Sequence, residues 1–240
     1  MKNAKLKQAL SYQLSDFAYN SLYVYGIALL VIAGLAIFAT TSEGNIITNV
    51  GIGGVGFIHL LVLGIAGIRS DLRFFIQHGI GRRTTFFSNL YGSIICSIAL
   101  GLFCEIVNVS VSLLPGFVVE TEWLVQSFLI SWLSHAVMFF FAWQIGALIS
   151  LVYYRLSKTQ QIVFTVLAIA ALVLGVRVLG VLGVMIEHLT GAIQLDATVF
   201  VIPVYAPTLT MPVIVLIIAI LAAVGNYLLI RRVQIKESVS

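Results

Sequence analysis

Four ionisable residues lie inside long apolar stretches of this chain, where a charged side chain is energetically unfavourable unless it has a partner or a function. Glu105 and Arg177 are an acid and a base, and His59 and His135 carry imidazoles. Ionisable groups in hydrocarbon are costly, so they usually face the interior of a helical bundle, where they pair or contact a transported species. These four residues are therefore the first candidates for chemistry inside a membrane.

Glu105 and Arg177 lie at matching depths in their stretches. Each is about 15 or 16 residues from the basic end of its stretch, or ~23 Å at ~1.5 Å per residue. The spacing allows an intramembrane ion pair, which either locks two helices together or lines a polar translocation path. The structural role is favoured because paired charges in a bundle are most often structural. For His59 and His135, a hydrogen-bonded packing role is favoured over a proton relay.

Motifs for other kinds of chemistry are absent. The sequence has no G-x-x-x-x-G-K-[ST] loop for ATP phosphates, no H-E-x-x-H and no G-x-S-x-G. No cofactor or metal site is expected on this chain, and any ATP and Mg would be bound by a partner. Gly51, Gly53 and Gly56 match G-x-G-x-x-G only formally, since no strand precedes them, and helix packing is the favoured interpretation. Cys96 and Cys104 are ~12 Å apart along one helix, beyond disulfide reach.

The apolar stretches are long enough to span a membrane. Sixty per cent of the 240 residues are hydrophobic and 9% are charged, whereas a soluble domain carries roughly a quarter charged residues. Each stretch has at least the ~20 residues needed to cross ~30 Å of hydrocarbon. We expect an all-α membrane protein with one transmembrane domain over residues 1–240. Its six helices are expected at about 21–39, 47–68, 90–113, 123–154, 161–186 and 210–230.

Basic residues fall in alternate gaps between these stretches. Twelve of the thirteen Lys and Arg lie in segments that share one side of the membrane if the stretches span it. The other gaps carry acids, at Glu43, at Glu120 and Glu122, and at Glu187 and Asp196. Because basic residues collect on the cytoplasmic side, both termini are expected in the cytoplasm. The same distribution beside anionic lipid explains the pI near 9.2 without a nucleic acid partner.

Residues 5–17 combine an apolar face with a polar face. Leu6, Leu10, Leu14 and Phe17 recur at helical spacing, while Lys, Gln and Ser occupy the other side. The pattern predicts a helix lying in the inner interface, with its apolar face toward the acyl chains. A disordered cationic tail is the alternative.

The segment from Arg69 to Phe87, RSDLRFFIQHGIGRRTTFF, is the longest internal gap on the basic side. Ser70 can cap a short helix that runs to about His78, and Gly79 can end it in the left-handed conformation. Adjacent exposed phenylalanines on such a helix predict a docking surface for a cytoplasmic partner, with a solvated connector as the alternative. The residues of the predicted surface are Asp71, Arg73, Phe74, Phe75, Ile76, His78 and Arg82.

The outer segment 187–210 is too long for a tight turn and too apolar for a solvated loop. Three of the four prolines, Pro203, Pro207 and Pro212, lie in or just after it. We expect short broken or re-entrant helices there, because such backbone is tolerated only against protein or a water-filled cavity.

These features together resemble the type-two ABC transporter permeases. They are the six spans, the leading interfacial helix, the 69–87 loop and the elaborated outer segment before the last span. The chain is most similar to small permeases of Gram-positive bacteria, in which a hydrophobic-x-N-G-hydrophobic-S-R-K-T loop is common. His78 stands where Asn is frequent, and Gly81 stands where Ser is frequent. The resemblance covers essentially the whole chain, and the loop is its one sharp motif.

The resemblance implies that the 69–87 loop is a coupling helix seated in a groove of a cytoplasmic ATPase. It also implies an exporter in a bacterial cytoplasmic membrane, with two ATPases and a second permease, identical or paralogous. A mostly apolar bundle favours an amphipathic or hydrophobic substrate, such as a peptide, a lipid or an antibiotic. Two alternatives stay open: an ion-coupled secondary transporter, expected to show unpaired intramembrane carboxylates, and a non-transporting membrane immunity or assembly protein.

Overall fold

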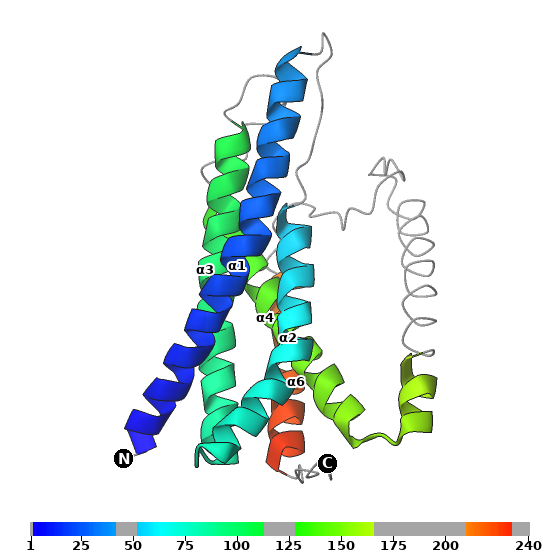
Figure 1. Cartoon of the computed structure of the whole chain (residues 1–240). Coiled ribbons are helices and arrows are strands. Elements are labelled where there is room, and N and C mark those ends of the chain that lie inside the picture. The colour runs from blue at the N-terminus through cyan, green and yellow to red at the C-terminus, as the bar shows by residue number, and fades with distance from the viewer. Residues whose placement is uncertain (1, 42–51, 113–127, 166–209, 232–240) are drawn as a thin grey trace. The chain divides into compact units, whose positions relative to one another are not determined.

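The computed structural model of this chain describes residues 2–41, 52–112, 128–165 and 210–231 (Figure 1). Contacts divide the chain into a larger unit, residues 1–151 with 205–240, and a smaller unit, residues 152–204. The larger unit contains the helices that build the candidate sites.

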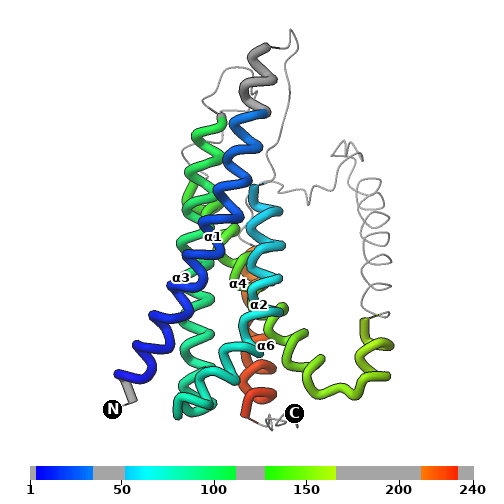
Figure 2. The backbone as a smooth tube through the Cα atoms, viewed as in Figure 1, coloured from blue at the N-terminus to red at the C-terminus, as the bar shows by residue number. Residues whose placement is uncertain are grey.

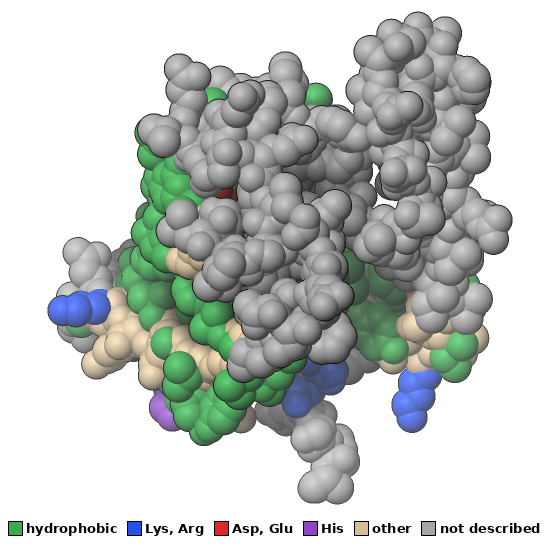
Figure 3. Space-filling view, turned by 90° about the horizontal axis from the view of Figure 1, so that it is seen from above, with side chains coloured by type: hydrophobic (Ala, Val, Ile, Leu, Met, Phe, Trp, Pro, Cys, Tyr) green, Lys and Arg blue, Asp and Glu red, His purple; other side chains and the backbone are tan. Residues whose placement is uncertain are grey.

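Every element in the described ranges is a helix, and those ranges contain no strand. The helices are α1 (Lys2–Thr41), α2 (Ile52–Gln77), α3 (Arg82–Ser112), α4 (Phe128–Arg155) and α6 (Thr210–Arg231), and residues 158–165 are also helical. Within these ranges, five helices are long and apolar enough to cross a membrane. This confirms the all-α class and gives a helix at five of the six predicted stretches. Each of these helices carries exposed large hydrophobic side chains, and hydrophobic patches show where described residues are visible from above (Figure 3).

Most of the predicted span at 161–186 and the outer segment 187–210 lie outside the described residues, so both stay predictions. In the smaller unit, the turn after α4 is closed by a side chain. Gln161 Nε2 donates to the backbone carbonyls of Tyr153 and Leu156 at 3.1 and 3.2 Å. The helix at 158–165 therefore starts from a well-bonded turn.

The predicted interfacial helix and the first span form one continuous helix rather than two elements. Ala18, Tyr19 and Asn20 join them, and none of these residues breaks a helix as Gly or Pro does. The apolar face also points elsewhere than expected. Leu14 and Phe17 pack against the hydrophobic core instead of turning toward acyl chains.

The predicted short helix that starts at Ser70 is the C-terminal part of α2, which runs without a break to Gln77. Ser70 is not a cap, because its hydroxyl donates to the Gly67 carbonyl one turn earlier, at 2.9 Å. The predicted end of the helix is confirmed. Gly79 has φ of 69°, the left-handed conformation that glycine adopts without steric cost.

A seam of glycine holds α2 against α4. A Cβ built on Gly64 would lie 2.5 Å from the Trp143 carbonyl oxygen and 3.1 Å from the Ala147 nitrogen. Gly146 on α4 meets the backbone of α2 from the opposite side, at Leu61 and Gly64. Such close backbone approach is a common way for membrane helices to associate, because small residues maximise van der Waals contact.

The N-terminus of α1, the turn between α2 and α3, and the C-terminus of α6 meet at one end of the larger unit (Figure 2). Lys5 Nζ donates to the Gly79 carbonyl at 2.9 Å, and Arg82 Nη1 donates to the Arg231 carbonyl at 3.5 Å. Three segments that the charge pattern places on one side of the membrane therefore lie together. We call this the basic end.

Candidate functional site: the corner between α2 and α3

The turn from α2 to α3, residues 74–82, is here called the corner. Its backbone forms a Schellman motif, in which the Ile80 amide donates to the Phe75 carbonyl at 2.8 Å. The Gly79 amide donates to the Ile76 carbonyl at 3.0 Å and completes the motif. The side chains of Ile80 and Phe75 pack together in a small buried cluster with Ala9 of α1. This combination of hydrogen bonds and apolar contact fixes the direction in which α3 leaves the turn.

The N-terminal part of α1 covers the inner side of the corner. Lys5 donates a hydrogen bond to the Gly79 carbonyl. Its positive charge is also stabilised there by the negative, C-terminal end of the α2 helix dipole. The Tyr12 ring stacks on Phe74 with centroids 5.0 Å apart and meets the edge of Phe75 at 5.9 Å. The corner is thus supported by a third helix rather than standing free between two spans.

A polar network fastens the same three helices. Gln13 on α1 donates through Nε2 to Asp71 Oδ2 of α2 at 2.6 Å. Its Oε1 accepts a hydrogen bond from the Ser88 hydroxyl of α3, also at 2.6 Å. Gln13 and Ser88 are buried, so both faces of one amide are used where water has little access. The network gives α1 a fixed register on α2 and α3.

The structure divides the predicted docking residues into two groups. Phe75 is 1% exposed, so the expectation that it meets a partner is wrong: α1 and Ile80 already cover it. Asp71 bonds Gln13 instead of standing on a polar rim, and Ile76 is half-buried. Phe74 remains 38% exposed. The outward group, here called the corner surface, is Arg73, Phe74, His78 and Arg82.

His78 is held in place by its own helix. Its Nδ1 donates to the Phe74 carbonyl at 2.7 Å, and its ring lies 4.2 Å from the Phe74 ring, centroid to centroid. The Phe74 ring therefore contacts both Tyr12 and His78, while part of it stays exposed. A rigid, partly exposed aromatic ring is the kind of side chain that anchors contacts with another protein.

The intramembrane acid has partners other than the one predicted. Glu105 on α3 is 8% exposed, and its Oε2 accepts a hydrogen bond from the Ser131 hydroxyl of α4 at 3.0 Å. His135 Nδ1 lies 3.3 Å from the same oxygen and 3.0 Å from the Ser131 carbonyl. Arg177 lies outside the described residues, so the Glu105–Arg177 pair stays a prediction.

The two histidines sit in packed surroundings. His59 Nε2 lies 3.2 Å from the Ser21 hydroxyl of α1, and the Tyr25 ring meets its imidazole edge at 5.5 Å. His135 packs against the α2 backbone, where a Cβ on Gly53 would approach its Nε2 to 2.9 Å. Both environments are those expected of packing residues that form hydrogen bonds within a bundle.

A second buried amide joins three helices farther from the corner. Gln144 on α4 donates to the Ser93 hydroxyl of α3 at 2.9 Å. Asn226 on α6 donates to the Gln144 side-chain oxygen and to its backbone carbonyl, each at 3.0 Å. Neither Gln144 nor Gln13 was predicted from the sequence as a site residue. In each case the available signal was a lone amide on an otherwise apolar helix face.

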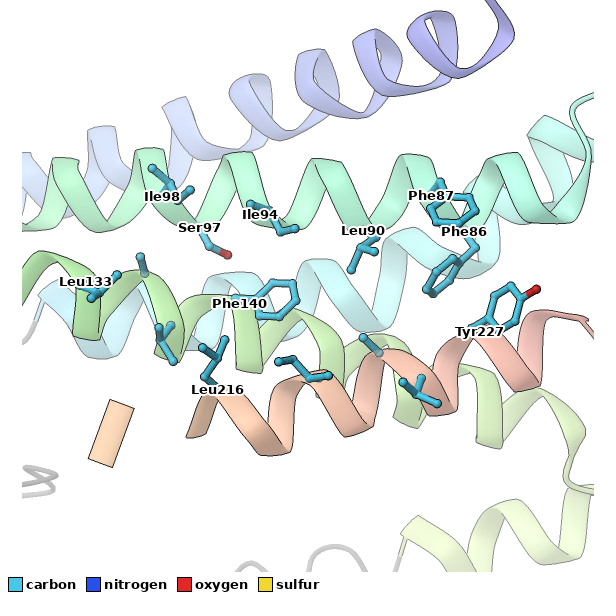
Figure 4. A pocket seen from close by; sticks show the side chains of 15 residues that line it. Phe86, Phe87, Leu90, Ile94, Ser97, Ile98, Leu133, Phe140, Leu216 and Tyr227 are labelled. Carbon is cyan, nitrogen blue, oxygen red and sulfur yellow. The ribbon is translucent and has the colours of Figure 1, made fainter. Parts of the chain in front are cut away.

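An apolar groove of about 730 Å³ lies between α3, α4 and α6 (Figure 4). We call it the α3/α6 groove. Phe86, Phe87 and Tyr227 mark one end, and Ile98, Leu133 and Leu216 mark the other. Hydrophobic stretches alone could not reveal it, because a groove depends on which faces of three helices meet.

Within the described ranges, no group of three or more His, Cys, Asp or Glu side chains is placed to hold a metal ion. Cys96 and Cys104 are free and buried on α3. The sequence matches no protein-family model and no curated protein, and the fold matches no solved structure.

Proposed function

We propose that this chain is the membrane-spanning permease subunit of an ABC exporter, whose ATP is hydrolysed by separate ATPase subunits. Helices of spanning length and a sequence without a phosphate-binding loop support the proposal. The expected substrate is amphipathic or hydrophobic: a peptide, a lipid or an antibiotic. The expected site of action is a bacterial cytoplasmic membrane, with both termini in the cytoplasm and a second permease as partner.

The observation that carries the proposal is that the corner has one set of residues packed against α1 and another set exposed on its surface. Phe75 and Asp71 attach the corner to α1, while Phe74 and the corner arginines face outward. A coupling element must transmit force, so it needs an inner side that is rigidly packed and an outer side that can bind a partner. A surface that is already ordered also loses little conformational entropy when a partner binds.

The size of the expected interaction follows from the exposed fraction of Phe74. Burying a whole phenylalanine contributes ~1.5–3 kcal/mol, and 38% of this side chain remains exposed. Covering it therefore contributes ~1 kcal/mol, and losing it weakens association about five-fold. The arginines add a charge-dependent part that salt screens.

Ion-coupled transport receives less support from the same structure. That alternative expects an unpaired intramembrane carboxylate, whereas Glu105 contacts both Ser131 and His135. Glu105 is therefore not the unpaired carboxylate that this alternative expects.

The test is co-purification of an ATPase with variants of the full chain. Phe74→Ser should retain about five-fold less ATPase, because the exposed part of the ring is lost. It should lose ~1–2 kcal/mol of stability, because the ring also contacts Tyr12 and His78. Tyr91→Ser is the matched control, since Tyr91 is 45% exposed on α3 away from the corner, and it should retain the ATPase.

Phe75→Ala separates docking from folding. The side chain is 1% exposed, so its truncation should lower the unfolding free energy by ~3–5 kcal/mol. Undiminished ATPase retention by Phe74→Ser would remove the corner surface from the coupling role. A wild-type chain that retains no ATPase from its own cell would contradict the exporter proposal as a whole.

A further inference from the structure

The α3/α6 groove is apolar along its length and basic at one end. Its lining comes from α3, α4 and α6, and Ser97 and Tyr227 provide its hydroxyl groups. Figure 4 shows the Ser97 hydroxyl on the groove side of α3. Ser97 is 1% exposed, and its Oγ has no hydrogen-bond partner within the described part of the chain. The lining therefore accepts an apolar chain rather than a segment with many polar groups.

The length of the groove matches one leaflet of a bilayer. Phe86 and Ile98 mark its two ends on α3 and are twelve residues apart. At ~1.5 Å per residue the groove is ~18 Å long, close to half of a ~30 Å hydrocarbon core. One acyl chain of a lipid in a single leaflet spans this depth.

The end of the groove at Phe86 is the basic end of the bundle. Arg82 and Arg83 begin α3, and Arg231 ends α6, and all three are exposed. Arg82 also donates to the Arg231 carbonyl, which joins the two helices beside the mouth of the groove. Among the described residues this is the one hydrogen bond of the Arg82 guanidinium, which leaves four of its five N–H donors for another acceptor. Basic sites between membrane helices on the cytoplasmic side attract anionic lipid headgroups.

We propose that the α3/α6 groove binds an anionic phospholipid of the cytoplasmic leaflet, with one acyl chain in the groove and its phosphate at Arg82, Arg83 and Arg231. The inference does not depend on the exporter proposal, because it needs no ATPase and no transported substrate. Its argument is the coincidence of an apolar slot one leaflet deep with three arginines at its mouth.

The experiment is photolabelling of the full chain in lipid nanodiscs. The probe is phosphatidylglycerol that carries a diazirine near the end of one acyl chain, and the labelled residues are identified by mass spectrometry. Label should concentrate at the distal end of the groove, near Ile98 and Leu216. Unlabelled phosphatidylglycerol should compete at least ten-fold better than phosphatidylcholine.

Two pairs of variants test the slot and the headgroup site separately. Val224→Trp fills the groove from a residue that is 52% exposed, and it should abolish the distal label. Ile217→Trp is the matched control, since Ile217 is 53% exposed on the same helix outside the lining, and it should label normally. Arg83→Gln with Arg231→Gln should weaken phosphatidylglycerol competition by about 25-fold, at about five-fold per charge.

Three results would overturn the proposal. Equal competition by both lipids would show ordinary boundary lipid without a site. Distal labelling that persists in Val224→Trp would place the acyl chain outside the groove. Disulfide cross-linking of Ile220→Cys to a cysteine introduced within residues 166–209, or to Ile220→Cys of a second copy, would show that protein fills the groove instead.

Discussion

The seam between α2 and α4 and the α3/α6 groove use small residues with opposite results. In the seam, Gly64 and Gly146 face each other, so the two backbones meet and no space remains. In the groove, Ala136 also lies close to a glycine, since a Cβ on Gly101 would approach its backbone nitrogen to 3.1 Å, yet the bulky Phe86 and Phe140 line the same space. Small residues thus bring two backbones together in the seam, whereas in the groove they stand among larger side chains and leave a recess.

The largest loss of stability should come from placing a side chain in the seam between α2 and α4. Gly64→Val places side-chain atoms against the α4 backbone, which cannot rotate away, and should lower the unfolding free energy by ~3 kcal/mol. Gly67→Val on the same helix is the control, because a Cβ there meets nothing within 4 Å. Thermal unfolding of the purified chain in detergent measures both. Equal stability of the two variants would mean that the seam is not a close backbone contact.

An intermediate effect is expected where α3 meets α4 around Glu105. Glu105→Leu removes the acceptor for Ser131 and His135 and should cost ~1–3 kcal/mol, whereas Glu105→Gln keeps an oxygen acceptor and should cost less. A double-mutant cycle of Glu105→Gln with His135→Gln should show a coupling of at least ~0.5 kcal/mol. If a cycle with Arg177→Gln gives the larger coupling, Arg177 is the main partner of the acid.

The smallest change in stability is expected from substitutions of two serines that lie one turn apart on α3. Ser93→Ala removes the acceptor for Gln144 and should destabilise the chain by ~1 kcal/mol. Ser97→Ala removes a buried hydroxyl that has no partner in the described part of the chain, so stability should stay equal or rise slightly. A loss at Ser97 as large as that at Ser93 would indicate that its hydroxyl is satisfied after all.

Sequence reasoning succeeded where a property depends on neighbours along the chain. Hydrophobic length predicted the helices, and the position of Gly79 predicted the end of α2 and its left-handed turn. It failed where the property depends on a third helix. The exposure assigned to Phe75 assumed a corner standing alone, yet Ala9 and Tyr12 of α1 cover it.

The same limit applies to the polar residues. Matching depth allowed a Glu105–Arg177 pair, but depth does not specify which helices are adjacent. His135 and Ser131 contact the acid because α3 and α4 pack there. The orientation predicted for the apolar face of residues 5–17 met the same limit. The amphipathic pattern identifies an apolar face, and both lipid and protein can cover such a face.

The buried amide of Gln144 has a consequence for the order in which the chain is assembled. Asn226, on α6, donates a hydrogen bond to the Gln144 side-chain oxygen. A ribosome delivers α3 and α4 well before α6, so a nascent chain carries this oxygen without its Asn226 donor until α6 inserts. A chain truncated before α6 keeps a buried acceptor that this donor never reaches. Insertion of α6 is thus the step of biogenesis that satisfies the Gln144 amide.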